Sequence, residues 1–291
     1  MHNTIHPLRI EKICLDQFGF FIRRHRRYLV VFLALYCYCL FSWRRTALLR
    51  AGHCLIQHLD DVLDGDRLVD VHPLAYVDDL LRQVESGHYD LTQPIPTLAC
   101  FVFAEADARC GQDADIRSEL LALIRTLCFD RQRLDARMLL PQATLAEQHC
   151  RTFIHSINVS LMMVDSRLRA EDVPEMVGAL AWCSPMRDLP DDLRRGLVNI
   201  PLEVIEQARR EGVETLGYDA LIATHAVRAW LRQEFQRGQE NLRTVPRRLR
   251  KLWPKRGVLE IWAFYVEVER YAARYARKHK ALLDTLEDQQ P

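Results

Sequence analysis

The sequence has few of the features that divide a chain into domains or place it in a membrane. Only 11 of the 291 residues are glycine and 12 are proline, and no Gly/Ser-rich linker or low-complexity block interrupts the chain. The longest apolar run, residues 28–41, has 14 residues, short of the roughly 20 that span a bilayer. The N-terminus lacks the apolar core of a signal peptide. These absences predict one domain over residues 1–291 in a cytoplasmic protein.

Charge and cysteine usage exclude two further classes. The formal net charge is +1, so the chain as a whole has no excess charge to attract nucleic acid. The nine cysteines are scattered through apolar segments and none forms a Cys-x-x-Cys pair. Buried, reduced thiols fit this pattern better than a zinc site or a disulfide framework.

Apolar residues recur at helical spacing, and no segment shows the alternation of β-branched residues that is typical of strands. The sequence therefore predicts an all-α protein. Thr144 with Glu147 has the form of a capping box at a helix start, and Pro185 with Pro190 should bend or interrupt the helix that contains them. The predicted helices cover residues 28–41, 43–64, 73–86, 96–109, 115–140, 144–168, 171–188, 202–211, 218–242 and 257–286.

Two acidic stretches stand out among these helices. In residues 187–201, Asp188 and Asp192 are four apart, so on a helix they share one face and repel each other by roughly 0.2 to 0.5 kcal/mol. Upstream, Asp60 and Asp64 have the same spacing. Mg²⁺ prefers carboxylate oxygens and leaves positions for phosphate oxygens. A single acidic cluster is more often a solvated helix end, but the two together predict a clamp for a metal-bound diphosphate.

These stretches carry a resemblance to the squalene/phytoene synthase family that extends over about residues 15–275. Asp60-Asp61-Val62-Leu63-Asp64-Gly65 is similar to the first aspartate-rich motif of that family, and Arg187 to Gly196, continuing to Pro201, is similar to the second. Pro246-Arg247-Arg248 and Trp262-Ala263-Phe264-Tyr265 resemble its C-terminal region. The resemblance implies a single-domain helical bundle of the class I isoprenoid (terpene) synthase type around a central cavity.

The resemblance also implies an activity and a set of site residues. The expected enzyme is a Mg²⁺-dependent prenyltransferase that condenses farnesyl or geranylgeranyl diphosphate head to head and releases diphosphate. Whether NADPH is used stays open, as do the chain length, the acceptor and the oligomeric state. The expected metal ligands are Asp60, Asp61, Asp64, Ser184, Asp188 and Asp192, of which the five aspartates are also the expected catalytic residues. The expected substrate contacts are Gln57, His155, Asn158, Arg187, Arg194, Arg195 and Tyr265.

The sequence departs from the family pattern at several of these positions. Ala181 and Ser184 stand where the family has Gln-x-x-Asn, although a hydroxyl ligand is found in the metal triad of class I terpene cyclases. His155 and Asn158 stand where two glycines leave room for prenyl chains. We expect these larger side chains to shorten the tunnel and to favour a product other than the usual head-to-head hydrocarbon.

Two alternative functions remain at this point. The chain could be a class I terpene cyclase, or another enzyme that ionises one prenyl diphosphate. It could also be a non-catalytic family member that acts in assembly or interaction. Separately, the basic segments 23–27 and 243–256 are either solvated connections or sites of peripheral contact with anionic lipid.

Overall fold

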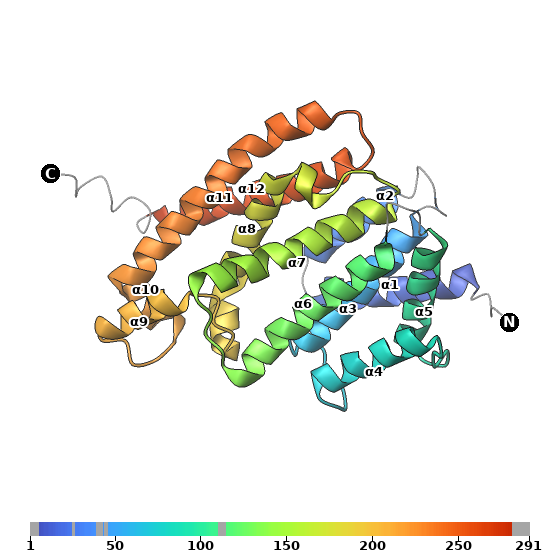
Figure 1. Ribbon diagram of the computed structural model, residues 1–291, viewed down its shortest axis with the longest axis horizontal. Coiled ribbons are helices and arrows are strands. Elements are labelled where there is room, and N and C mark those ends of the chain that lie inside the picture. Colours follow the sequence, from blue (N-terminus) through green and yellow to red (C-terminus); the bar gives the residue numbers. More distant parts are fainter. Residues whose placement is uncertain (1–5, 25–26, 39–42, 44–45, 110–114, 281–291) are drawn as a thin grey trace. The chain divides into compact units, whose positions relative to one another are not determined.

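The computed structural model describes residues 6–24, 27–38, 43, 46–109 and 115–280. Over these residues it contains twelve α-helices, one 3₁₀ turn and no strand (Figure 1). The predicted all-α class is confirmed. The elements are α1 (Pro7–Arg24), α2 (Arg27–Tyr38), α3 (Ala47–Leu63), α4 (Pro73–Ser86), α5 (Pro94–Ala108), α6 (Ile116–Ala136), α7 (Gln142–Met163), the 3₁₀ turn η1 (Ala170–Asp172), α8 (Pro174–Arg195), α9 (Leu202–Arg210), α10 (Tyr218–Ala223), α11 (His225–Leu252) and α12 (Val258–Lys278).

The chain forms two compact units. The first consists of residues 1–131 with 162–165, and the second consists of residues 132–161 with 166–291. The division passes through α6 and α7, which each contribute residues to both units. The single domain expected from the sequence stays a prediction.

The first unit is organised around α3, which packs against α1, α4 and α5. Most of α3 is buried, including Leu48, Leu55 and Leu59, which have no exposed surface. Gly52 lets the Met163 side chain approach so closely that a Cβ there would lie 2.3 Å from its terminal methyl carbon. The helix ends at Leu63 with Asp64 as its C-cap, and the following Gly65 has a φ of 75°, the left-handed conformation that glycine adopts without strain. The predicted stop at Gly65 is confirmed.

The second unit is organised around α8, which packs against α10, α11, α12 and η1. In Figure 1, α8, α11 and α12 lie side by side. Trp182 of α8 is buried in an aromatic cluster, with ring centroids 5.7 Å from Phe235, 5.7 Å from Tyr271 and 5.9 Å from Tyr275. Each unit therefore has one central helix, and each central helix carries one of the two acidic stretches.

Several helix boundaries differ from the sequence prediction. The α8 helix continues through Pro185 and Pro190 to Arg195, because buried side chains before and after Pro185 pack it into the core and outweigh the cost of proline. The α11 helix likewise passes Pro246 and includes most of the basic segment 243–256, which the sequence predicted to be a connection. The start predicted at Thr144 was wrong, since α7 begins at Gln142.

The helix predicted over residues 218–242 is two helices. Thr224 lies in an extended conformation between α10 and α11, and its hydroxyl accepts a hydrogen bond from the Val227 N–H at 3.3 Å. Glu211 also caps α11, because its two carboxylate oxygens accept hydrogen bonds from the N–H groups of His225 and Ala226 at 2.6 and 3.1 Å. A carboxylate at a helix N-terminus is stabilised by the free N–H groups and the helix dipole.

No helix within the described residues is both long enough and apolar enough to cross a membrane.

Candidate functional site

The first acidic stretch forms the last turn of α3, and Asp61 is its buried member, 5 % exposed. One Asp61 oxygen, Oδ1, accepts a hydrogen bond from Gln57 Nε2 at 2.9 Å. The other, Oδ2, is buried and has no hydrogen-bond partner in the described part of the chain. Burial raises the pKa of Asp61, and the bond from Gln57 opposes that rise. A buried carboxylate oxygen without a donor is costly, so this oxygen is suited to a ligand.

The neighbouring members of the stretch surround Asp61. Asp60 is half-buried and its Oδ2 lies 3.3 Å from the same Gln57 Nε2. Asp64 is exposed at the C-terminal end of α3. The structure therefore brings Gln57, Asp60 and Asp61 together on one side of the last two turns.

Arg67 follows this stretch and was not among the residues predicted for the site. The Arg67 N–H donates to the Asp61 carbonyl oxygen at 2.8 Å, and the guanidinium carbon lies 3.8 Å from the centre of the Phe20 ring. Its Nε and Nη2 are buried and have no hydrogen-bond partner among the described residues. Burial lowers the pKa of Arg67 and the charge of Asp61 opposes this. A planar donor of this kind next to buried carboxylates is suited to a phosphate group. The only sequence signal was a basic residue directly after the motif.

The second acidic stretch forms the last turns of α8, and its first aspartate is already paired. Arg187 donates from Nε to Asp188 Oδ1 at 2.9 Å and from Nη2 to Asp188 Oδ2 at 2.6 Å. The same Nη2 lies 3.3 Å from Ser184 Oγ. Burial lowers the pKa of Arg187, but the bonds and charge of Asp188 raise it by more, so the net shift is upward. Ser184, Arg187 and Asp188 are thus brought together, with both Asp188 oxygens occupied by a cation from the same chain.

Asp192 belongs to a different network, centred on Asn199. The Asn199 Nδ2 donates to Asp192 Oδ2 at 2.9 Å, and Asn199 Oδ1 lies 3.2 Å from the Arg133 Nη2 and 3.4 Å from the His149 Nε2. Arg133 is 1 % exposed and also donates to the Val198 carbonyl oxygen at 2.9 Å. Arg133 was not among the residues predicted for the site, because helical spacing alone does not separate a buried arginine from an exposed one.

The remaining predicted substrate contacts lie at varied positions in the second unit. Arg194 and Arg195 are exposed in the last turn of α8, and Arg194 forms an ion pair with Asp191. Tyr265 is buried in α12 and donates to Glu269 Oε1 at 2.8 Å, with burial, followed by the Glu269 carboxylate, raising its pKa to about 12.

The two side chains expected to narrow the tunnel have different surroundings. Asn158 is buried, and its Oδ1 accepts a hydrogen bond from the Ala170 N–H at 2.8 Å, which ties α7 to η1. His155 is half-buried, one turn earlier on α7. Asn158 therefore has a structural partner, and the effect of both residues on a tunnel stays a prediction.

The acidic stretches on α3 and on α8 fit a divalent cation to different degrees. In the described part of the chain, no group of three or more His, Cys, Asp and Glu side chains is arranged to hold a metal ion. On α3, the buried Asp61 Oδ2 fits a cation as it stands. On α8, Asp188 must first exchange Arg187 for the cation. Because α3 and α8 belong to different units, their predicted arrangement on opposite walls of one cavity stays a prediction.

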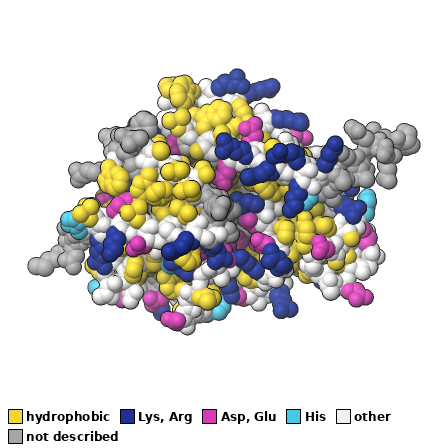
Figure 2. Space-filling view, turned by 180° about the vertical axis from the view of Figure 1, so that it is seen from behind, with side chains coloured by type: hydrophobic (Ala, Val, Ile, Leu, Met, Phe, Trp, Pro, Cys, Tyr) yellow, Lys and Arg dark blue, Asp and Glu magenta, His cyan; other side chains and the backbone are white. Residues whose placement is uncertain are grey.

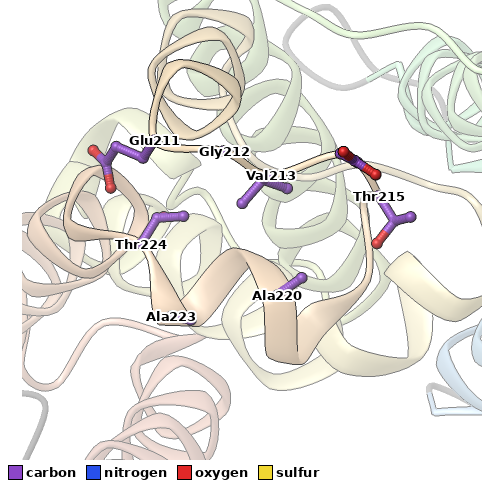
Figure 3. A pocket seen from close by; sticks show the side chains of 8 residues that line it. Glu211, Gly212, Val213, Thr215, Ala220, Ala223 and Thr224 are labelled. Carbon is purple, nitrogen blue, oxygen red and sulfur yellow. The ribbon is translucent and has the colours of Figure 1, made fainter.

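A pocket of about 450 Å³ lies elsewhere in the second unit (Figure 3). It is formed by the end of α9, the following turn and α10, and none of the predicted site residues lines it. Glu211 and Glu214 are its acidic lining residues, and the Glu211 carboxylate caps α11.

The described residues define an all-α protein with one acidic stretch on α3 and another on α8. Among solved structures the chain is similar to squalene synthase HpnC from Alicyclobacillus acidocaldarius, with a TM-score of 0.62 and 19 % sequence identity over 91 % of this chain and 95 % of that one. The resemblance expected from the motifs is thus confirmed at the level of the fold. No protein-family model and no curated protein sequence matches the chain significantly.

Proposed function

We propose that this protein is a Mg²⁺-dependent prenyltransferase that acts on isoprenyl diphosphates such as farnesyl or geranylgeranyl diphosphate. The observation that carries the proposal is the last turn of α3, where the buried Asp61 has an oxygen without a partner beside Asp60 and Gln57. The likeness to a squalene synthase over nearly the whole chain supports a head-to-head condensation with release of diphosphate.

In this proposal the carboxylates hold the metal and the arginines hold the diphosphate. Asp60, Asp61 and Asp64 would bind Mg²⁺ from α3, and Ser184, Asp188 and Asp192 would bind it from α8. When bound, Mg²⁺ would neutralise charge on the leaving diphosphate. Arg187 leaves Asp188 and donates to a phosphate oxygen, since its forked donors suit phosphate as well as carboxylate. Arg194 and Arg195 add positive charge at the end of the same helix.

In this proposal, apolar and aromatic side chains exclude water from the allylic cation. Trp182 and its ring neighbours Phe235, Tyr271 and Tyr275 form a buried aromatic cluster at the middle of α8. This cluster also holds α8 in place one to two turns before Asp188. We assign it a positioning role.

The experiment is Mg²⁺-dependent release of pyrophosphate from farnesyl and geranylgeranyl diphosphate, with the products identified by mass spectrometry. We expect Asp61→Ala and Asp188→Ala to remove turnover while circular dichroism stays unchanged. Asp191→Ala is the matched control, because Asp191 lies on the same turn of α8, is exposed and pairs only with Arg194 in the contacts described above. Wild-type turnover in either site variant would show that the ligand assignment is wrong.

One observation favours a second candidate, a non-catalytic protein that retains the helical shell. The bidentate Arg187–Asp188 pair stabilises α8 without any metal, so the second acidic stretch has a structural use of its own. Under this candidate, purified protein releases no pyrophosphate with any prenyl diphosphate. Arg187→Gln would then destabilise the second unit without changing any binding of Mg²⁺ and pyrophosphate.

A further inference from the structure

The α2 helix is apolar on both of its sides. No charged residue occurs between Tyr28 and Tyr38. Its inner side is aromatic and packs on α1: the Phe32 ring centre lies 5.3 Å from that of Phe18, and the Tyr28 ring centre lies 5.6 Å from that of Phe21. The aromatic side of α2 is therefore packed against α1.

The outer side of α2 is aliphatic and exposed. Leu29, Val30 and Leu33 are 45 %, 63 % and 51 % exposed, and Ala34 and Cys37 on the same side are exposed as well. Single exposed apolar residues are ordinary, whereas a continuous apolar face on one helix marks an interaction site. The space-filling view in Figure 2 shows that hydrophobic side chains gather in patches on this side of the molecule.

The charge next to this face indicates what covers it. Arg23 and Arg24 lie in the last turn of α1, where Arg23 is exposed and Arg24 forms an ion pair with Asp66. The sequence continues with His25, Arg26 and Arg27 directly before the apolar helix. A short apolar helix beside a cluster of arginines is typical of a segment that lies in the interface of an anionic membrane.

The length of α2 agrees with such a position. Its 12 residues span about 18 Å at 1.5 Å per residue, against roughly 30 Å of hydrocarbon. The helix is thus long enough to lie on a membrane and too short to cross one.

We propose that the outer face of α2, defined by Leu29, Val30, Leu33, Ala34 and Cys37, docks the protein on anionic membranes, with the exposed Arg23 at the headgroups. This inference is separate from the proposed function, because vesicle binding needs neither substrate nor turnover. The other basic segment, residues 243–256, is a weaker candidate for membrane contact. There Arg248 is paired with Glu175 at 2.7 Å, and the exposed large apolar side chains are Trp253 and Leu259.

The test is co-sedimentation of the purified full chain with phosphatidylglycerol vesicles and with phosphatidylcholine vesicles, without substrate or Mg²⁺. We expect binding to the anionic vesicles that weakens with salt. The double variant Val30→Asp, Leu33→Asp should reduce the partition coefficient by more than about tenfold, since it adds two negative charges and removes two apolar contacts. Leu33→Trp should increase it. Leu68→Asp is the matched control, a lone apolar residue of the same unit that is 94 % exposed.

The variants should fold normally, because the substituted side chains point away from α1. If circular dichroism shows that the aspartate double variant misfolds, the milder double variant Val30→Ser, Leu33→Ser takes its place. We expect this serine variant to lose vesicle binding as well. Equal binding by wild type and the folded double variants would overturn the proposal. So would binding lost only on Trp253→Ser, or a dimer in sedimentation velocity that the α2 variants dissociate while wild type leaves vesicles unbound.

Discussion

The position of the second acidic stretch depends on the close approach of α8 and α11 at Gly238. A Cβ atom at Gly238 would lie 2.4 Å from Trp182 Cδ2 and 2.6 Å from its Cε3, closer than carbon atoms pack. Trp182 is 4 % exposed and enclosed by other aromatic rings, so its ring has little room to move. Gly238→Ala must therefore separate the two helices or displace the ring.

The expected size of this effect is the difference between two opposing changes. Overpacking a core costs about 1 to 3 kcal/mol, whereas replacing glycine by alanine inside a helix gains roughly 0.8 to 1 kcal/mol. We therefore expect Gly238→Ala to lower the free energy of unfolding of the second unit by up to about 2 kcal/mol. Because α8 carries Asp188, we also expect turnover to fall.

Urea unfolding followed by circular dichroism measures the effect, and Gly19→Ala is its control. Gly19 is a helical glycine in α1 whose Cβ would meet nothing within 4 Å, so alanine there should stabilise by roughly 0.5 to 1 kcal/mol. The double change of Gly238→Ala with Trp182→Leu should recover more than about 1 kcal/mol relative to the sum of the single changes. If Gly238→Ala stabilises as much as Gly19→Ala, the packing of α8 on α11 is not as described.

Two further predictions concern other parts of the chain. Replacing both His155 and Asn158 by glycine should shift the products made from farnesyl or geranylgeranyl diphosphate towards longer hydrocarbons. It should also lower the free energy of unfolding by about 1 to 3 kcal/mol, because the hydrogen bond from the Ala170 N–H is lost. If mass spectrometry shows unchanged products, these two residues do not limit a tunnel. His58, buried between Gln17 and Tyr76, has its pKa lowered from 6.5 to about 3 by burial and then by Arg67. The folded state thus binds fewer protons than the unfolded state, so stability is unaffected above pH 6.5 and falls as the pH decreases towards 3. The His58→Gln variant should lack this part of the acid loss in pH-dependent unfolding.

The all-α class and most of the helices could be predicted from the sequence because amphipathic spacing is a local property. The stop at Gly65 was equally readable, since the need for a left-handed conformation belongs to one residue. The course of α8 through Pro185 was not, because burial in the core outweighed a local preference. Continuation of α11 through Pro246 has the same cause.

The candidate site shows the same limit. The spacing of Gln57 and Asp61 placed them on one face of α3, and the hydrogen bond between them confirms that geometry. The pairing of Arg187 with Asp188 depends on side-chain rotamers. The hydrogen bonds of Asn199 link Asp192 to Arg133, which lies 59 residues earlier in the sequence. No local pattern predicts contacts of either kind.

The two acidic stretches are unequal, and the inequality bears on how a ligand would bind. On α3, the Asp61 Oδ2 lacks a partner in the described residues, so a cation there adds an interaction without breaking one. On α8, both oxygens of Asp188 accept hydrogen bonds from Arg187, so a cation must replace a charge-assisted pair. The displaced Arg187 needs a new anion, and the diphosphate of a prenyl substrate would supply it. The α3 stretch is therefore expected to bind metal by itself, and the α8 stretch only together with diphosphate.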